Sequence, residues 1–321
     1  MEKLLSVSSS PHIKEKHSIQ SIMIDVIIAL IPALTASVWI FGFRALFVTL
    51  ISCISCVFFE WIWQKFTKQP ITIKDLSAVV TGMLLAYNLP ANVPIYVVIV
   101  GAFVAIILTK QIFGGIGQNF INPALAARAF LLAAYPMQVT SFSQPLESAG
   151  GLGSVDAITS ATPLALMKMG NIENLPDFME VFIGTIAGCL GEVSALALLL
   201  GAAYLLVRKV ITWHIPVFYL TTLFIITFIF GGQGIYMSFY SLFLGGAILG
   251  GFFMATDYTT TPMTVKGQII YAIGAGIITA VIRLFGGYPE GVSYSILLMN
   301  LVVPIIDRYV KVKRFGEVKK A

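Results

Sequence analysis

Residues 81–94 read TGMLLAYNLPANVP, an apolar run that ends in a polar turn with two prolines. A similar stretch, LGGFFMATDYTTTP, occupies residues 249–262, which lie 168 positions later. A second pair of stretches, FGGIGQNF at 113–120 and FGGYPEGV at 285–292, has a similar offset of 172 positions. The two matches indicate an internal repeat with one copy in each half of the chain.

The composition predicts an integral membrane protein. Of the 321 residues, 58% are hydrophobic and only 11% are charged, whereas a soluble domain carries about 25% charged residues. Apolar runs near 20 residues long are typical of membrane-spanning helices rather than barrel strands. We therefore predict an all-α membrane protein. The net charge of +5 comes from basic residues at helix ends, so we predict no nucleic-acid partner.

The apolar runs predict about ten transmembrane helices, five in each copy of the repeat. Because five is an odd number, the two copies should have opposite orientations, which makes this a five-plus-five inverted repeat. Two runs are short for a full span of about 20 residues and are predicted to be broken, tilted or re-entrant; these are 76–89 and 120–135. The other runs are 21–41, 45–63, 95–113, 188–207, 215–230, 239–255, 268–285 and 292–306.

Basic residues predict the orientation of the chain. If the N-terminus is cytoplasmic, 16 Lys and Arg residues lie on the cytoplasmic side and three on the outer side, as the positive-inside rule requires. Both termini are then cytoplasmic. The predicted organisation is an N-terminal segment (1–20), a first repeat (21–135), an outward loop (136–179), a second repeat (180–307) and a basic cytoplasmic tail (308–321).

The outward loop contains the small, polar stretch DAITSAT at 156–162. No histidine lies near it, so a serine-hydrolase triad is not supported. The stretch has neither a Walker pattern nor a dinucleotide fingerprint, and we predict no catalytic residue in the chain. The Thr162 hydroxyl, flanked by small residues, suits modification by another enzyme. The alternative is an ordinary Ser/Thr-rich loop with local side-chain turns.

Five stretches together resemble a known family: FGGIGQNFINPALAARAFL (113–131), DAITSATPL (156–164), GEVSALALLLGAA (191–203), FFMATD (252–257) and YSILLMNLVVPIIDR (294–308). The chain resembles the integral membrane D subunit of the Rnf ion-translocating electron transport complex, which is homologous to the B subunit of the sodium-pumping NADH:quinone reductase. The resemblance covers nearly the whole chain. The short region before the first span favours the Rnf type.

This resemblance implies a covalent flavin. In the family, a flavin transferase joins FMN through a phosphoester to the last threonine of a D-G-x-[S/T]-G-A-T-like motif. The matching residue is Thr162, and Asp156, Thr159 and Ser160 belong to the same motif. Ala157 and Ser160 replace the two glycines of the motif, but both residues are small.

The resemblance also implies the activity and the partners. The chain would be a subunit, inactive alone, of an oxidoreductase in a prokaryotic plasma membrane. The complex would couple ferredoxin oxidation and NAD reduction to export of Na⁺ or H⁺. The chain has no site of its own for NAD or ferredoxin, so these would bind other subunits.

A second, non-covalent flavin is implied near the glycine-rich stretch at 113–120. Asn119 and Asn122 are three residues apart and would share one face of a helix if the segment is helical there. Their amides can pair with the polar edge of a flavin ring, and the resemblance implies that they help to hold riboflavin. A simpler role for Asn122 is to cap a helix that starts at Pro123. Arg128 is a candidate partner for a flavin ring, a phosphate or a buried acid.

Carboxylates in apolar segments are candidates for an ion path. Burying one in a membrane costs at least about 2.5 kcal/mol, so each needs a compensating role. Glu192, between glycine and apolar residues, is the strongest candidate. The others are Asp257, Asp307, Glu60 and Asp25. Cys53 and Cys56 offer two thiols, which cannot close a four-ligand site, and we predict no metal site.

Two other kinds of protein fit the composition and the repeat. One is a transporter or channel for a small solute or ion, without a redox cofactor. The other is a scaffold subunit that only anchors its partners. Flavin bound to the purified protein would favour the flavoprotein over both of these alternatives.

Overall fold

The structure is a computed structural model that describes residues 18–145, 161–232, 234–287 and 290–311. Its elements in these ranges are all helical, which confirms the predicted fold class. Asp156, Thr159, Ser160, most of the N-terminal segment and most of the basic tail lie outside the described residues.

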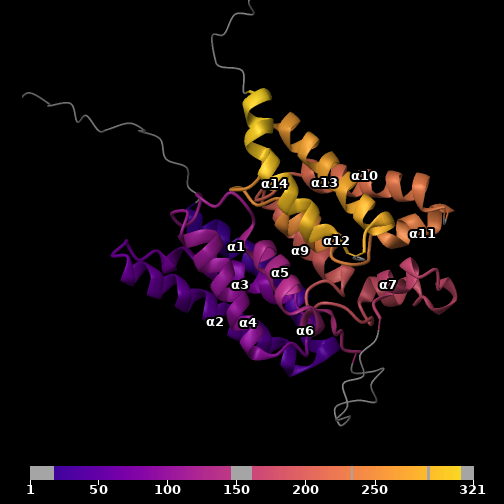
Figure 1. The fold of residues 1–321 in the computed structure, drawn as a ribbon, viewed down its shortest axis with the longest axis horizontal. Coiled ribbons are helices and arrows are strands. Elements are labelled where there is room, and N and C mark those ends of the chain that lie inside the picture. The colour runs from indigo at the N-terminus through magenta and orange to yellow at the C-terminus, as the bar shows by residue number, and fades with distance from the viewer. Residues whose placement is uncertain (1–17, 146–160, 233, 288–289, 312–321) are drawn as a thin grey trace, which may run out of the picture.

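The elements fall into three groups along the chain (Figure 1). The first group comprises α1 (Ile19–Phe41), α2 (Phe43–Phe66), η1 (Ile73–Asp75), α3 (Ser77–Tyr87), α4 (Ile95–Phe103), η2 (Val104–Gln111) and α5 (Pro123–Ala134). The connecting region holds α6 (Pro136–Thr140), α7 (Pro163–Lys168), η3 (Ile172–Asn174) and α8 (Phe178–Ile183). The last group comprises α9 (Ala195–Val207), α10 (His214–Gly231), α11 (Gly234–Ser241), α12 (Ala247–Leu249), η4 (Gly250–Met254), α13 (Val265–Phe285) and α14 (Val292–Tyr309).

Within the described ranges, five helices are long and apolar enough to cross a membrane: α1, α2, α10, α13 and α14. Shorter apolar helices are α3, α5, α9 and the continuous stretch of α4 and η2. The two runs predicted to be short or broken are indeed short, because α3 has 11 residues and α5 has 12.

Three runs predicted as full spans differ from a continuous α-helix in the structure. The run 188–207 is helical only from Ala195. The run 239–255 is broken between α11 and α12, where Gly245 and Gly246 have positive φ values of 56° and 67°, a conformation that glycine adopts without steric penalty. The run 95–113 continues as a helix but changes to the wider π-helical form in η2. Hydropathy alone cannot distinguish these shapes from a continuous span.

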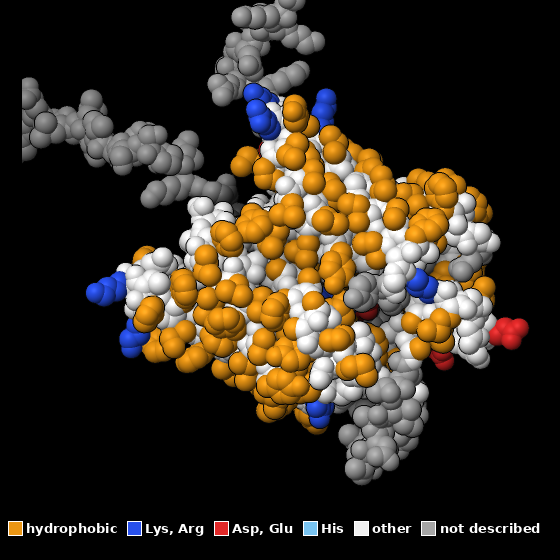
Figure 2. All heavy atoms as spheres, viewed as in Figure 1, with side chains coloured by type: hydrophobic (Ala, Val, Ile, Leu, Met, Phe, Trp, Pro, Cys, Tyr) orange, Lys and Arg blue, Asp and Glu red, His pale blue; other side chains and the backbone are white. Residues whose placement is uncertain are grey.

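The outer surface of the described chain is apolar, as lipid contact requires. In Figure 2, hydrophobic side chains cover the broad middle of the molecule, and Lys and Arg side chains gather mainly at its edges. Phe43 and Trp39 are among the large exposed side chains, with 78% and 61% exposure.

Helices that correspond in the two predicted repeat copies lie against each other: α1 packs on α9, and α5 packs on α14. In the first half α2 packs on α3 and α4, and in the second half α10 packs on η4 and α13. These contacts join the two halves of the chain, and the five-plus-five inverted repeat stays a prediction. The start of α1 and the end of α14 lie toward the upper side in Figure 1, while α6 and α7 lie toward the lower side.

Candidate functional site

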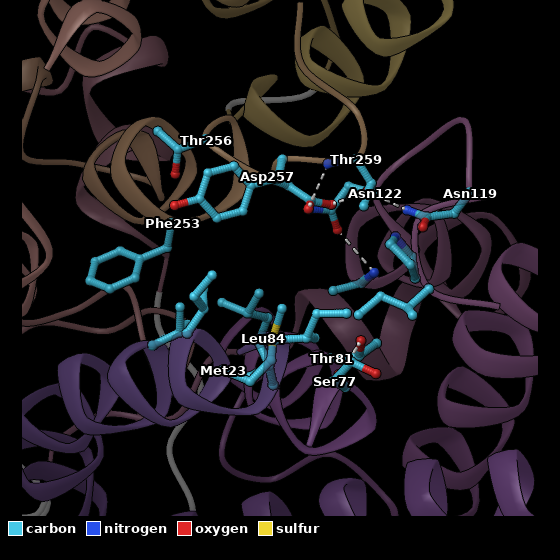
Figure 3. A pocket seen from close by; sticks show the side chains of 18 of the residues that line it. Met23, Ser77, Thr81, Leu84, Asn119, Asn122, Phe253, Thr256, Asp257 and Thr259 are labelled. Carbon is cyan, nitrogen blue, oxygen red and sulfur yellow. Dashed lines mark hydrogen bonds between the residues drawn. The ribbon is translucent and has the colours of Figure 1, made fainter. Parts of the chain in front are cut away.

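A cavity of about 310 Å³, which we call the first cavity, lies between α1, α3, the start of α5 and η4. Its walls are mostly apolar, with Val26, Leu84 and Phe253 among them. Figure 3 shows Asp257, Thr259, Asn122 and Asn119 grouped on one side of the cavity, with Ser77 and Thr81 on the opposite side and Thr256 apart from both groups. The polar lining residues are Ser77, Thr81, Lys110, Asn119, Asn122, Thr256, Asp257 and Thr259.

Asn119 and Asn122 both line the first cavity, but they do not share a helix face. The helix α5 begins at Pro123, and Asn122 is its N-cap: its Oδ1 accepts from the backbone N–H groups of Ala124 (3.0 Å) and Leu125 (3.2 Å). The capping role is confirmed. A shared face required a helix from Asn119 to Asn122, and this condition is not met, because proline at the first helical position fixes the start of the helix. The loop before it, rather than a helix, brings Asn119 to the cavity.

Asp257 lies beside Asn119, joined to it through Thr259 (Figure 3). The Asn119 Nδ2 atom donates to the Thr259 hydroxyl (3.0 Å), which donates to the Asp257 carboxylate (3.1 Å). The Thr259 backbone N–H also donates to this carboxylate (3.3 Å). A predicted flavin-binding residue and a predicted ion-path residue, 138 positions apart in the sequence, therefore share one hydrogen-bond chain.

Glu60 lies in a buried cluster with Lys110. The Lys110 Nζ atom lies 3.0 and 3.2 Å from the two Glu60 oxygens and donates to the Ser77 hydroxyl at 2.6 Å. Gln111 also donates to Glu60, at 2.6 Å. From the sequence, Lys110 counted only as a cytoplasmic charge, and this pair was missed. Its position inside an apolar run was the available signal.

A second cavity of about 220 Å³ contains the Thr162 side chain. Its other lining residues include Arg128 and Ala129 of α5, Ala165 of α7, and Glu290 and Tyr294 near the start of α14. Thr162 is the N-cap of α7, because its Oγ1 accepts from the Ala165 N–H (3.3 Å), and Pro163 occupies the first helical position. The threonine singled out by the sequence thus lies in a cavity rather than in a featureless loop.

Arg128 is the centre of a buried cluster at the edge of the second cavity. It forms ion pairs with Glu192, at 3.0 Å, and with Glu290. It also donates to the backbone carbonyl (2.8 Å) and the side-chain oxygen (2.9 Å) of Asn88, and to the Cys189 sulfur. Of the three kinds of partner considered for Arg128 in the sequence, the structure shows a buried acid. Asn88, Cys189 and Glu290 were missed from the sequence, because only the folded chain brings them together.

The same cluster offers three potential metal ligands: one atom each of Cys189, Glu192 and Glu290 lie within 4.8 Å of one another. The Arg128 guanidinium contacts all three side chains. Because the arginine already supplies the positive charge that these groups need, we interpret the cluster as an ion-pair network rather than a metal centre.

The remaining acidic candidates, Asp25 and Asp307, do not line either cavity. Asp25 joins α1 to α9 through a hydrogen bond from Tyr204 (2.8 Å) and an ion pair with Arg208 (3.2 Å). Asp307 accepts from the backbone N–H of Met263 (3.2 Å). Both carboxylates make contacts that hold elements together, and neither lines a cavity described above.

The helix α5 connects the two cavities. Asn122 at its start lines the first cavity, and Arg128 lines the second. Six residues of helix rise by about 9 Å. Two groups bound in these cavities would thus be close neighbours, separated by a single helix and the Arg128 cluster.

These features define an integral membrane protein with two adjoining, largely apolar cavities, each with a few polar side chains, as is typical of cofactor sites. The chain belongs to the NQR2, RnfD, RnfE family, whose model matches residues 6–316.

Relatives of known role match along nearly their whole length. The chain is 52% identical over 318 residues to the D subunit of the Na⁺-translocating ferredoxin:NAD⁺ oxidoreductase complex of Acetobacterium woodii, covering 98% of this chain and 96% of the relative. It is 44% identical over 326 residues to the D subunit of the proton-translocating complex of Clostridium ljungdahlii, with 98% and 97% coverage. It is also 33% identical to the D subunit of the ion-translocating oxidoreductase complex of Escherichia coli K12, with 98% and 99% coverage.

Proposed function

We propose that this chain is the membrane flavoprotein subunit of an ion-translocating ferredoxin:NAD oxidoreductase, with FMN attached to Thr162 and riboflavin in the first cavity. The observation that carries the proposal is the position of Thr162: the last residue of the flavinylation-like motif lines a cavity beside Arg128. The names of the most similar relatives support the oxidoreductase role. Partner subunits supply the sites for ferredoxin and NAD.

The second cavity suits a covalently held flavin. A flavin transferase would use FAD as the donor: the Thr162 oxygen would bond to the phosphorus of the FMN moiety, the pyrophosphate bond of FAD would break, AMP would leave, and the hydroxyl proton would pass to the transferase. The phosphate would then lie at the start of α7, where helix N–H groups and their dipoles favour negative charge, and within the same cavity as Arg128. The apolar residues Leu132, Val139 and Phe142 offer surface to a ring. Covalent attachment prevents loss of the flavin from the outer side of the membrane.

The first cavity suits riboflavin, which has no phosphate. Its mostly apolar walls can contact the flat faces of an isoalloxazine ring. Asn119, Asn122, Asp257 and Thr259 provide donors and acceptors for the polar edge of the ring. When bound, flavins carry electrons; the residues of this chain bind and orient them and exclude water.

The decisive experiment is in-gel flavin fluorescence. The chain is produced in cells that contain the flavin transferase, denatured, separated by electrophoresis and viewed under ultraviolet light. We expect a fluorescent band for the wild type and none for Thr162→Ala. Thr140→Ala is the matched control, because Thr140 lines the same cavity, and its band should stay fluorescent. A non-fluorescent wild-type band would instead favour a transporter or a scaffold.

Riboflavin is tested separately. We expect Asn119→Ala to lower the amount of flavin that denaturation releases, while the covalent fluorescence at Thr162 remains. Asn119 is preferred to Asn122 for this test, because Asn122 also caps α5 and its loss would destabilise the helix by about 1 kcal/mol. Equal release from wild type and Asn119→Ala would remove Asn119 from the site.

Ion translocation by the complex is the third part of the proposal. Among the predicted ion-path carboxylates, Glu192, Asp257 and Glu60 lie in or beside polar clusters at the cavities. Carboxylate oxygens can bind Na⁺ or exchange H⁺. The two most similar relatives described above translocate different ions, so the coupling ion of this chain is either of these two.

A further inference from the structure

Lys110 has no role in the function proposed so far, yet it lines the first cavity and forms a buried ion pair with Glu60, which is considered above only as an ion-path carboxylate. We propose that Lys110 sets the redox potential of the flavin in this cavity, and that Glu60 limits the size of its effect. The inference rests on the proposed occupancy of the first cavity by a flavin. It assigns Lys110 as a tuning residue that raises the potential.

Lys110 is placed to act on a group in the cavity. It is the only Lys or Arg among the described residues that line the first cavity. Its side chain is 3% exposed, so little water screens its charge. In such surroundings the electrostatic effect of one charge is several times larger than in water. Asp257, which lines the same cavity, is an acidic residue. Lys110 therefore supplies the positive charge in the wall of this cavity.

Glu60 is placed behind Lys110 rather than in the cavity. It contacts the Lys110 Nζ atom with both oxygens but does not line the first cavity. A group in the cavity therefore lies nearer to the lysine charge than to the glutamate charge, and the pair presents a net positive field to it. The glutamate weakens this field without reversing it.

The helix geometry around Lys110 indicates that this residue has a functional role. Lys110 belongs to the π-helical segment η2, and π-helical turns occur frequently at functional sites. In this segment the neighbouring residues Lys110 and Gln111 both reach the Glu60 carboxylate. The Ser77 hydroxyl, which accepts from Lys110, donates in turn to Asp75 (2.7 Å). These contacts fix the ammonium group at the cavity wall.

The charge and the flavin chemistry determine the sign of the effect. Two-electron reduction of an isoalloxazine ring, with one proton added at N5, leaves one negative charge near N1 and the C2 carbonyl. The electrons come from the ferredoxin side of the proposed complex. A nearby positive charge stabilises this reduced form and raises the midpoint potential, since charge near the ring tunes flavin electronics. Removing Lys110 therefore lowers the potential, and removing the Glu60 charge raises it.

The test uses the full chain, purified in lipid nanodiscs from cells without the flavin transferase, so that only non-covalent flavin is present. Its midpoint potential is measured by spectroelectrochemical titration with dithionite and mediators. The variants are Lys110→Met, Glu60→Gln and the double variant with both changes. Lys65→Met is the matched control, because Lys65 lies near Glu60 on α2 but is exposed and rests on the Trp61 ring.

We expect the potential to fall in the order Glu60→Gln, wild type, double variant, Lys110→Met, with Lys65→Met equal to wild type. The double variant leaves neither charge unpaired, so it tests the inference even if Lys110→Met fails to fold. Equal potentials in the wild type, Glu60→Gln and the double variant would overturn the inference while the flavin site stands. A wild-type chain without flavin would instead overturn the proposed occupancy of the cavity, and this inference with it.

Discussion

At the scale of single residues, Arg128 is the positive charge that pairs with two acidic residues in the interior. One guanidinium pairs with Glu192 and Glu290 and also contacts Asn88 and Cys189. The side chain is buried, so its partners have no water to replace it. Glu192 and Glu290 therefore share one guanidinium as their counter-charge.

Replacing Arg128 with Leu should destabilise the protein severely. Removing one partner of a buried ion pair costs about 3–5 kcal/mol, because the other partner stays buried and uncompensated. Arg208→Leu is the control: Arg208 pairs with Asp25, but its side chain is 49% exposed, and the loss should be much smaller. Thermal unfolding in detergent compares the two variants. Similar melting temperatures would show that the Arg128 cluster contributes little to stability.

Glu192→Gln should separate ion transport from cofactor loading. The amide keeps the shape of the side chain and can still accept from Arg128, but it cannot carry the charge. We expect slower ion transport by the complex in membrane vesicles, with the fluorescence of the Thr162 flavin unchanged. Glu173→Gln, an exposed change in η3, is the control. Wild-type ion-dependent turnover in Glu192→Gln would remove Glu192 from the ion path.

At the scale of elements, short and interrupted helices bring polar groups into the interior. The broken segments α3, α9 and η4 end or begin beside Asn88, Glu192 and Asp257. Their backbones need close partners, since lipid offers none. Some of these backbone groups find their hydrogen-bond partners in a neighbouring turn. The N–H groups of Leu190 and Gly191 donate to the carbonyls of Leu89 (2.9 Å) and Tyr87 (3.0 Å).

Gly201 should be essential for the contact between α1 and α9. A Cβ atom at this position would lie 2.0 Å from the Ala29 carbonyl oxygen, a backbone atom that cannot move aside cheaply. We expect Gly201→Ala to destabilise the protein by about 1–3 kcal/mol, as overpacking does, and to lower its melting temperature. Gly287→Ala makes the same change where no atom lies within 4 Å and should be neutral. Equal melting temperatures would contradict the predicted tight contact.

The sequence predicted the short helices because prolines and polar residues interrupt those runs. These interruptions lie within the runs themselves, so one sequence is enough to detect them. It also predicted Thr162, Asn119, Asn122 and Arg128 as site residues, and the structure places them at two cavities. It could not predict the π-helical turns, because hydropathy has no signal for them. The partners Lys110 and Glu290 were missed because such pairs join residues 50 and 162 positions apart, which one sequence cannot relate.

At the scale of the whole molecule, the two halves meet along α1 with α9 and α5 with α14. The family match covers both halves. Relatives that translocate Na⁺ and H⁺ match the chain along more than nine-tenths of its length. Similarity at this level therefore extends to D subunits of complexes that are named for different ions.

The orientation of the whole chain can be tested with two exposed methionines. Met169, next to α7, and Met263, before α13, have 77% and 86% exposed side chains. The basic-residue count places the first outside and the second in the cytoplasm. We expect Met169→Cys to react with a membrane-impermeant maleimide in intact cells, and Met263→Cys only after the cells are opened. The native chain, with Cys53, Cys56 and Cys189, is the background control. The reverse pattern would invert the topology.

The walls of the second cavity come from both halves: Arg128 and Ala129 from α5 in the first, Glu290 and Tyr294 from the region of α14 in the second. A flavin tethered at Thr162 would be enclosed only after the halves have docked. Its emission anisotropy should then rise during assembly of the chain. The prosthetic group would thereby act as a built-in reporter of tertiary folding, readable in intact membranes without an added label.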